Sequence, residues 1–180
     1  MRVTSTQIPD VLVLEPEVYE DDRGFLFESF NSRRFKQLLG SGTAFVQDNQ
    51  SSSRQGVVRG FHYQVAPKAQ GKLVRVVQGE IFDVAVDLRK NSPTFGKWVG
   101  DILSAANRKQ IWIPEGFAHG FQALSATADV LYKITGYWSP DCERSIRWDD
   151  RFLDVNWPAA ITAVSERDRA ARSFAEADYF

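Results

Sequence analysis

Two histidines are the first groups that could do chemistry, because they are the only imidazoles in the 180-residue chain. His62 lies in the segment RGFHYQ and His119 in EGFAHGF, each beside glycine and aromatic residues. A lone histidine in such apolar, strand-like surroundings is more often a core residue bonded to a neighbouring carbonyl. Histidine is also the side chain best suited to carry protons near neutral pH. Both residues are therefore candidates for proton transfer or ligand contact.

The spacing of possible metal ligands argues against a metal centre. A protein metal site takes three or four ligands, often with paired histidines at short spacing. Here no two histidines are close in sequence, and Cys142 is the only cysteine. His62, His119 and a carboxylate could converge in space, but nothing in the spacing requires it. We therefore expect no catalytic metal.

Tyr132 and Lys72 are further candidates on predicted strands. Alternation in DVLYKITGYW places Tyr132 on one face with the apolar Val130 and Ile134. The pattern favours a core tyrosine, and the alternative is a phenol that delivers a proton inside a barrel. Lys72 shares a strand face with two valines, and lysine is rarely buried without a purpose. Its ammonium either reaches the rim or faces an anion, where it could stabilise negative charge on an oxygen.

Asp168 lies three residues after Ser165 in the segment SERD. This spacing is typical of a helix capping box, which would explain both residues without any catalysis. The alternative is that the Asp168 carboxylate reaches His62 and raises its basicity, as a carboxylate does beside a catalytic histidine.

Three arginines and one tryptophan are candidates for binding an anionic, aromatic ligand. Arg23 lies in a predicted turn and Arg59 beside a glycine, where a guanidinium and the backbone can approach a phosphate together. Arg167 is the third, and each of the three, taken singly, is more often a solvated surface charge. Trp138 could stack on a nucleobase, although a tryptophan at a strand end more often packs.

The elements that must position these side chains are mostly short strands with turn residues between them. Apolar alternation predicts strands over residues 72–77, 81–88, 110–114, 117–124 and 129–138, and two more around a turn at residues 21–24. Residues 78–80 are typical of the tight turn of a hairpin. In the strand over residues 81–88, Asp83 and Asp87 share a face with Ile81 and Ala85.

Helices are few. One is predicted over residues 31–40, with Asn31 or Ser32 as its cap and Gly40 as its stop, and another over residues 165–174. Many evenly spaced strands with few peripheral helices predict a mainly β fold, an antiparallel jelly-roll sandwich or barrel.

Composition limits the class of protein. A hydrophobic share of 43% and a charged share of 25% are ordinary for a globular chain, and no repeat or linker divides it, so we expect one domain over residues 1–180. A net charge of −1 argues against a nucleic-acid or membrane surface. The single cysteine and the lack of a signal-like or membrane-spanning apolar run predict a cytoplasmic protein.

Five segments together resemble the dTDP-4-dehydrorhamnose 3,5-epimerase family of the cupin superfamily. They are RGFHYQ, QGKLVRVVQGEIFDVAVDLRKNSPTFGKW, IWIPEGFAHGF, VLYKITGYW and SERD, in the right order over nearly the whole chain. The resemblance implies a jelly-roll (cupin) barrel and an enzyme without metal or cofactor. It further implies inversion of C3 and C5 in a dTDP-linked 4-keto-6-deoxyhexose on the way to dTDP-L-rhamnose. Both carbons flank the C4 ketone, so their protons are acidified by enolate formation.

The resemblance also implies roles for individual residues. His62 would be the base, Asp168 would orient it, Lys72 would hold the enolate oxygen, and Tyr132 would return a proton from the opposite face. Trp138 matches the position that stacks on thymine. The positions that match contacts to the nucleotide sugar are Arg23, Glu28, Gln47, Asn49, Arg59, His119, Glu143 and Arg167. Family members are homodimers whose N-terminal strands cross to the partner, so Arg23 and Glu28 are expected to act there.

Some positions depart from the family pattern. Phe61, Trp138 and Arg167 stand where leucine, tyrosine and lysine are usual, and the tail lacks expected prolines. Strict alternation also puts Arg59 and His62 on opposite strand faces, although both are expected at the ligand. We therefore predict a backbone irregularity at Arg59–Gly60.

Alternative functions remain open at this point. Relatives of this family invert only C3 or only C5, and a ketoisomerase of another dTDP-deoxysugar pathway would use similar residues. A different class is a catalytically silent protein that binds nucleotide sugars with the arginines alone. The presence of both His62 and Asp168 speaks against that last alternative.

Overall fold

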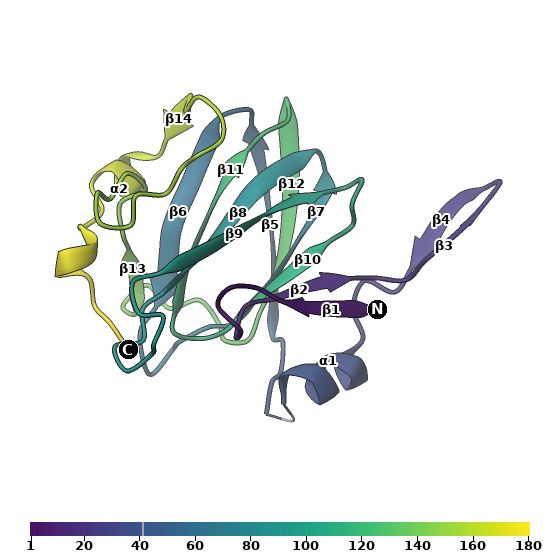
Figure 1. Ribbon diagram of the computed structural model, residues 1–180, viewed down its shortest axis with the longest axis horizontal. Coiled ribbons are helices and arrows are strands. Elements are labelled where there is room, and N and C mark those ends of the chain that lie inside the picture. The colour runs from purple at the N-terminus through teal and green to yellow at the C-terminus, as the bar shows by residue number, and fades with distance from the viewer. Residues whose placement is uncertain (41) are drawn as a thin grey trace.

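The computed structural model describes residues 1–40 and 42–180, which form a strand-rich sandwich with short helices at its edges (Figure 1). The helices are α1 (Ser32–Leu39), α2 (Glu166–Arg169) and the 3-10 helix η1 (Phe174–Glu176). The strands are β1 (Arg2–Ser5), β2 (Leu12–Glu15), β3 (Val18–Asp21), β4 (Gly24–Phe27), β5 (Gln47–Arg54), β6 (Val57–Gln64), β7 (Lys72–Gln78), β8 (Glu80–Asp87), β9 (Trp98–Ser104), β10 (Gln110–Ile113), β11 (Phe117–Ala123), β12 (Thr127–Ile134), β13 (Glu143–Ser145) and β14 (Ala163–Val164). None of the helices in the described part of the chain is long and apolar enough to cross a membrane.

Two sheets make the sandwich. The first has the strand order β1-β2-β10-β7-β12-β5, and the second has the order β13-β6-β11-β8-β9, with β14 added beside β6. All of these pairings are antiparallel except the parallel pairing of β14 with β6. The predicted antiparallel jelly-roll fold is confirmed.

The predicted hairpin at residues 78–80 is wrong. β7 lies between β10 and β12 in the first sheet, whereas β8 lies between β11 and β9 in the second. The turn therefore carries the chain from one sheet to the other. Alternation along each strand identifies its buried face but does not show whether two buried faces lie side by side or opposite each other. Here they lie opposite, so that Val74 of β7 and Ala85 of β8 share one core.

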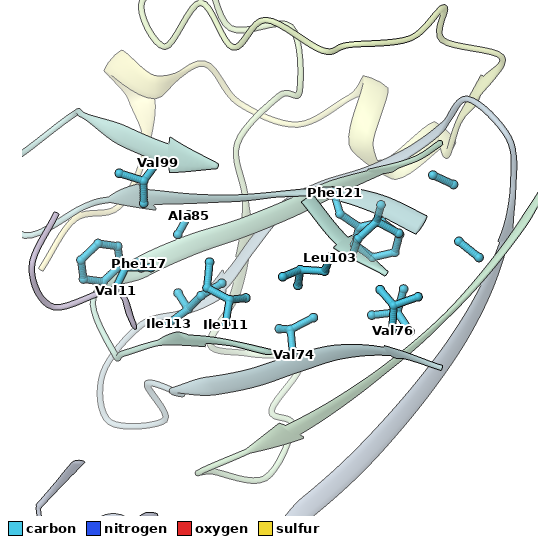
Figure 2. Packing of buried hydrophobic residues seen from close by; sticks show 14 of the residues in the cluster. Val11, Val74, Val76, Ala85, Val99, Leu103, Ile111, Ile113, Phe117 and Phe121 are labelled. Carbon is cyan, nitrogen blue, oxygen red and sulfur yellow. The ribbon is translucent and has the colours of Figure 1, made fainter. Parts of the chain in front are cut away.

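The main core fills the space between the two sheets. Figure 2 shows side chains of β7 and β10 pointing toward those of β8, β9 and β11. The other face of β8 is also apolar and packs under the C-terminal segment, with Val84, Val86 and Leu88 fully buried there. The faces of β8 therefore serve two cores, and Asp83 points into the one between the sheets with Ile81.

The first predicted helix forms as expected. The Asn31 side chain accepts hydrogen bonds from the backbone N–H groups of Arg33 and Arg34, so Asn31 is the N-cap and Gly40 ends the helix. Phe35 is 1% exposed and packs on Trp112 and its neighbours at the outer face of the first sheet.

The second predicted helix, over residues 165–174, is wrong in its length. α2 ends at Arg169 because the following residues find partners outside a helix. Arg172 forms a parallel bridge with Ile146, and the backbone N–H of Phe174 donates to the Asp150 carboxylate over 2.7 Å. Phe174 is thereby buried in the C-terminal core.

Asp87 organises the loop after β8 and gives a testable stability prediction. Its carboxylate is fully buried and accepts bonds from the side chains of Arg89, Ser92 and Thr94 at 2.6–2.9 Å. Burial alone would raise the pKa of Asp87, but these bonds outweigh it and lower the pKa from 3.8 to about 2. One pH unit is worth about 1.4 kcal/mol, so the ionised carboxylate contributes about 2 kcal/mol to folding.

Asp87→Asn is therefore expected to lower the free energy of unfolding at pH 7 by about 2 kcal/mol. This contribution is present above the ordinary aspartate pKa and is lost as the pH falls toward about 2. Urea unfolding of both proteins over this pH range measures the difference. If the difference in the free energy of unfolding between the two proteins stayed constant from pH 7 to about pH 2, ionisation of Asp87 would contribute nothing to stability.

Candidate active site

The His62–Asp168 pair joins β6 to α2 across 106 residues of sequence. His62 Nε2 lies 2.6 Å from Asp168 Oδ1, and the backbone N–H of Gly60 donates to the other carboxylate oxygen over 3.4 Å. Ser165 caps the helix by accepting from the Asp168 N–H, but the Asp168 carboxylate turns to His62 instead of back to the cap. Asp168 therefore has both a local and a long-range role.

Asp168 is in its charged form at neutral pH. Burial tends to raise the pKa of this carboxyl, but the hydrogen bond and electrostatic attraction of His62, together with the backbone N–H of Gly60, outweigh burial and lower it. Since an ionised carboxylate can only accept, the Nε2–H of His62 donates to Asp168. This hydrogen bond orients the ring and leaves Nδ1 as the nitrogen that can accept a proton.

The predicted irregularity at Arg59–Gly60 is confirmed. His62 pairs with His119 and Arg59 pairs with Phe121, so that β6 uses one residue more than β11 over this interval. Gly60 has a φ of 128°, and a Cβ built there would lie 2.5 Å from the Cα of Gly120. The extra residue brings Arg59 and His62 to the same hollow.

That hollow has a volume of about 330 Å³ and lies beside β6, β14 and α2. It is lined by Val57, Val58, Arg59, His62, Ala163, Val164, Ser165, Arg167 and Asp168. The Arg59 guanidinium is oriented by the Ser53 hydroxyl at 2.9 Å and the Ser52 carbonyl at 3.0 Å, both on β5. The side chains of Arg59, Arg167 and His62 therefore line the same opening.

Lys72 meets His62 from β7 of the facing sheet, and His119 meets it from the neighbouring strand β11. Lys72 Nζ donates to the backbone carbonyl of His62 over 3.0 Å, and the residue is half-buried. Burial lowers the pKa of Lys72 to about 8, although the negative charges of Asp83 and Glu143 act in the opposite direction. Burial also lowers the pKa of His119, so that its ring is neutral at pH 7.

Asp83 is a site residue that the sequence reasoning missed. It is 0% exposed, and its Oδ2 lies 2.8 Å from His119 Nε2. The available signal was an acid that shares a strand face with Ile81 and Ala85, since a carboxylate on a core-facing side is rare unless paired.

Tyr132 approaches from the opposite sheet. It lies on β12 opposite Asn49 of β5, on the inner face predicted by alternation, and packs against the core between the sheets. Burial raises the pKa of its phenol, with the charge of Arg59 acting against this effect. Tyr132 therefore keeps its proton at neutral pH and can act as a donor.

A second group of predicted residues forms a connected network next to the hollow. Trp138, in the loop after β12, is 57% exposed and donates through Nε1 to Glu143 Oε2 over 2.9 Å. Arg167 contacts the same oxygen at 3.0 Å. Gln47 accepts from the Trp138 backbone N–H and donates to Asn49 over 2.9 Å. The structure therefore brings these five residues together.

Arg23 and Glu28 are not part of this arrangement within one chain. Arg23 lies in the turn between β3 and β4, pairs with Asp21 at 2.6 Å, and has a side chain that is 89% exposed. Glu28 pairs with Arg34 of the following helix at 3.1 Å. The β3–β4 hairpin projects from the body on the side away from α2 and β14 (Figure 1). Among the described residues, no cluster of three or more potential ligands gathers that could hold a metal ion.

Comparisons with known proteins agree with one another. The family model described as dTDP-4-dehydrorhamnose 3,5-epimerase matches residues 5–176. Curated proteins of that name from Shigella flexneri and Pseudomonas aeruginosa are 54% and 55% identical, over 100% of this chain and 99% of theirs. A crystal structure of dTDP-6-deoxy-D-glucose-3,5-epimerase from Legionella pneumophila, in complex with dTDP-4-keto-L-rhamnose, has a TM-score of 0.94 and 50% identity. It covers 98% of this chain and 94% of its own. The chain therefore belongs to the dTDP-4-dehydrorhamnose 3,5-epimerase family.

Proposed function

We propose that the protein converts dTDP-4-dehydro-6-deoxy-D-glucose into dTDP-4-dehydro-L-rhamnose by inverting C3 and C5, a step of dTDP-L-rhamnose biosynthesis. The observation that carries this proposal is the His62–Asp168 pair on one sheet with the protonated Tyr132 on the facing sheet. An inversion needs a base on one side of the carbon and an acid on the other. Family membership supports the choice of substrate.

Each inversion follows from the same four groups. His62 Nδ1 takes the proton from the carbon next to the C4 ketone, while Asp168 stabilises the resulting imidazolium through Nε2. The Lys72 ammonium stabilises the negative charge that develops on the ketone oxygen. Tyr132 then delivers its phenolic proton to the opposite face of the carbon. His62 then releases its proton to solvent and the Tyr132 phenolate takes one up, so that the same cycle can act at C3 and at C5, the two carbons that flank the ketone.

Trp138 is proposed to stack on the thymine base, with Glu143 holding its indole ring in place. Trp138→Ala is expected to weaken dTDP binding by about 1–3 kcal/mol, which is about 5- to 150-fold in Kd. Calorimetric titration with dTDP measures this change. Phe152→Ala removes another exposed aromatic ring, which stacks on Phe174 and lines neither the hollow nor this network, and should leave the affinity unchanged. Equal effects of the two substitutions would contradict stacking at Trp138.

We further propose a cytoplasmic homodimer in which the β3–β4 hairpin reaches the partner's site and delivers Arg23 and Glu28 there. The hairpin supports this by presenting Tyr19, Phe25 and Leu26, which are 57–73% exposed. Sedimentation should give twice the 20.4 kDa mass of one chain, and a monomer at assay concentrations would contradict the proposal. The single free thiol, Cys142, fits a reducing compartment.

The configuration of the product tests the proposed reaction. The protein is incubated with dTDP-4-dehydro-6-deoxy-D-glucose, and the product is trapped by reduction of its ketone. Nuclear magnetic resonance should show inverted configuration at both C3 and C5. Inversion at one carbon would assign a single-site epimerase instead, and movement of the ketone to C3 would assign a ketoisomerase.

A further inference from the structure

Asp83 presents a buried carboxyl group that the proposed mechanism does not use. It lies on β8, points between the two sheets and is 0% exposed. One carboxylate oxygen, Oδ2, bonds His119 at 2.8 Å, but the other, Oδ1, is buried without a hydrogen-bond partner in the described part of the chain. An unpaired buried carboxylate oxygen is destabilising unless a nearby cation offsets it.

His119 does not supply that cation. Its side chain is 7% exposed, and burial lowers its pKa, so that the imidazole is neutral at pH 7. The His119 Nε2–H therefore gives Asp83 a hydrogen bond without a charge. This bond also fixes the direction in which the carboxylate points.

Lys72 is the cation next to this pair, because its ammonium donates to the backbone carbonyl of His62, which pairs across the sheet with His119, the partner of Asp83. In the described residues its ammonium has no carboxylate within 4.0 Å and is held only by the His62 carbonyl at 3.0 Å. The ionisable groups around it are His62 on β6, Asp83 on β8, His119 on β11, Tyr132 on β12 and Glu143 on β13. Among these, Asp83 exerts the largest attraction on the Lys72 charge, ahead of Glu143.

We propose that Asp83 is a positioning residue for the epimerisation: oriented by His119, its carboxylate keeps Lys72 in the ammonium form at the C4 ketone. The inference rests on the role proposed above for Lys72. The carboxylate itself touches neither the sugar nor the reacting carbons. It acts only through the protonation and placement of Lys72.

The pH dependence of kcat/KM tests this assignment. Catalysis needs the Lys72 ammonium, and the pKa of Lys72 in the free protein is about 8, so kcat/KM should fall as the pH rises through that value. Asp83→Asn keeps the shape and the acceptor for His119 but removes the charge. In the Asp83→Asn variant, kcat/KM should then begin to fall at least about one pH unit lower. At pH 8, kcat/KM of the variant should therefore be about tenfold below its own value near pH 6.5.

Two further variants separate the proposal from destabilisation. Asp87→Asn removes another fully buried carboxylate from the same strand, outside the site, and should leave the alkaline limb unchanged. Asp83→Glu restores the charge. The pH at which kcat/KM falls should then return toward that of the unmodified protein, even if kcat/KM itself is lower. Asp83→Glu also serves as the test if Asp83→Asn does not fold.

A double variant identifies the group through which Asp83 acts. In a Lys72→Gln background, adding Asp83→Asn should no longer move the limb, because the titrating group is absent. The same displacement with and without Lys72, or an unchanged limb in Asp83→Asn, would overturn the proposal. Full activity of Lys72→Gln alone would instead overturn the role given to Lys72, so the two failures are distinct.

Discussion

His62→Ala is expected to lower kcat by about 10²- to 10⁴-fold, because a positioned base contributes about this factor to a proton transfer. The reason lies in the pair with Asp168, whose charged carboxylate fixes the ring and stabilises the imidazolium. The Kd for dTDP should stay within about threefold of that of the unmodified protein. The base acts on the sugar carbons and does not hold the nucleotide. Steady-state kinetics and calorimetry on the same preparation measure the two quantities.

The opposite pattern would contradict this role. A variant that loses dTDP affinity and turnover in parallel would place His62 among the binding residues. A variant that keeps both its dTDP affinity and its turnover would indicate that His62 is not the base, as expected of a protein that only binds nucleotide sugars. Urea unfolding of the variant shows whether either outcome comes from loss of structure. This control is needed because His62 lies in β6 between buried residues.

Tyr132→Phe is expected to reduce inversion by about 10²- to 10⁴-fold while exchange of the substrate's protons with solvent continues. Removing the phenol deletes the donor on the first sheet, but His62 can still abstract a proton and return a solvent proton to the same face. Exchange without inversion is therefore the signature of Tyr132 as the second acid. Mass spectrometry in heavy water gives exchange, and nuclear magnetic resonance gives configuration.

Tyr63→Phe is the matched control for this substitution. Tyr63 is 4% exposed, and its hydroxyl donates to the Asp178 carbonyl over 2.8 Å in the C-terminal core. Losing that bond lowers stability by about 1 kcal/mol and should leave both exchange and inversion intact. Equal loss of exchange and inversion in Tyr132→Phe would show that Tyr132 acts before the carbanion forms, against the proposed order.

The positions of the site residues on their strands could be predicted, because strand alternation is a local property. Tyr132 lies on the inner face of β12, as alternation predicts. β5 was not among the predicted strands, although its burial alternates from Gln47 to Ser53. The break at Gly60 could be predicted only with the family resemblance. The resemblance places Arg59 and His62 at one ligand, whereas alternation puts them on opposite faces of a regular strand.

The partners of these residues could not be predicted from local pattern. Residues 78–80 form a turn, but its strands enter opposite sheets, because pairing depends on β9 to β12, which come later in the chain. The end of α2 depends on contacts with Ile146 and Asp150. Asp83 was overlooked because its importance comes from His119 and Lys72, which only the folded sandwich brings near it.

The most direct test of the account follows the hydrogens at C3 and C5 during turnover in heavy water. The protein is incubated with dTDP-4-dehydro-6-deoxy-D-glucose, and deuterium at each carbon is read by mass spectrometry and nuclear magnetic resonance. We expect deuterium at both carbons with the unmodified protein and at neither with His62→Ala. Tight nucleotide binding without exchange at either carbon, or exchange that persists unchanged in His62→Ala, would contradict it.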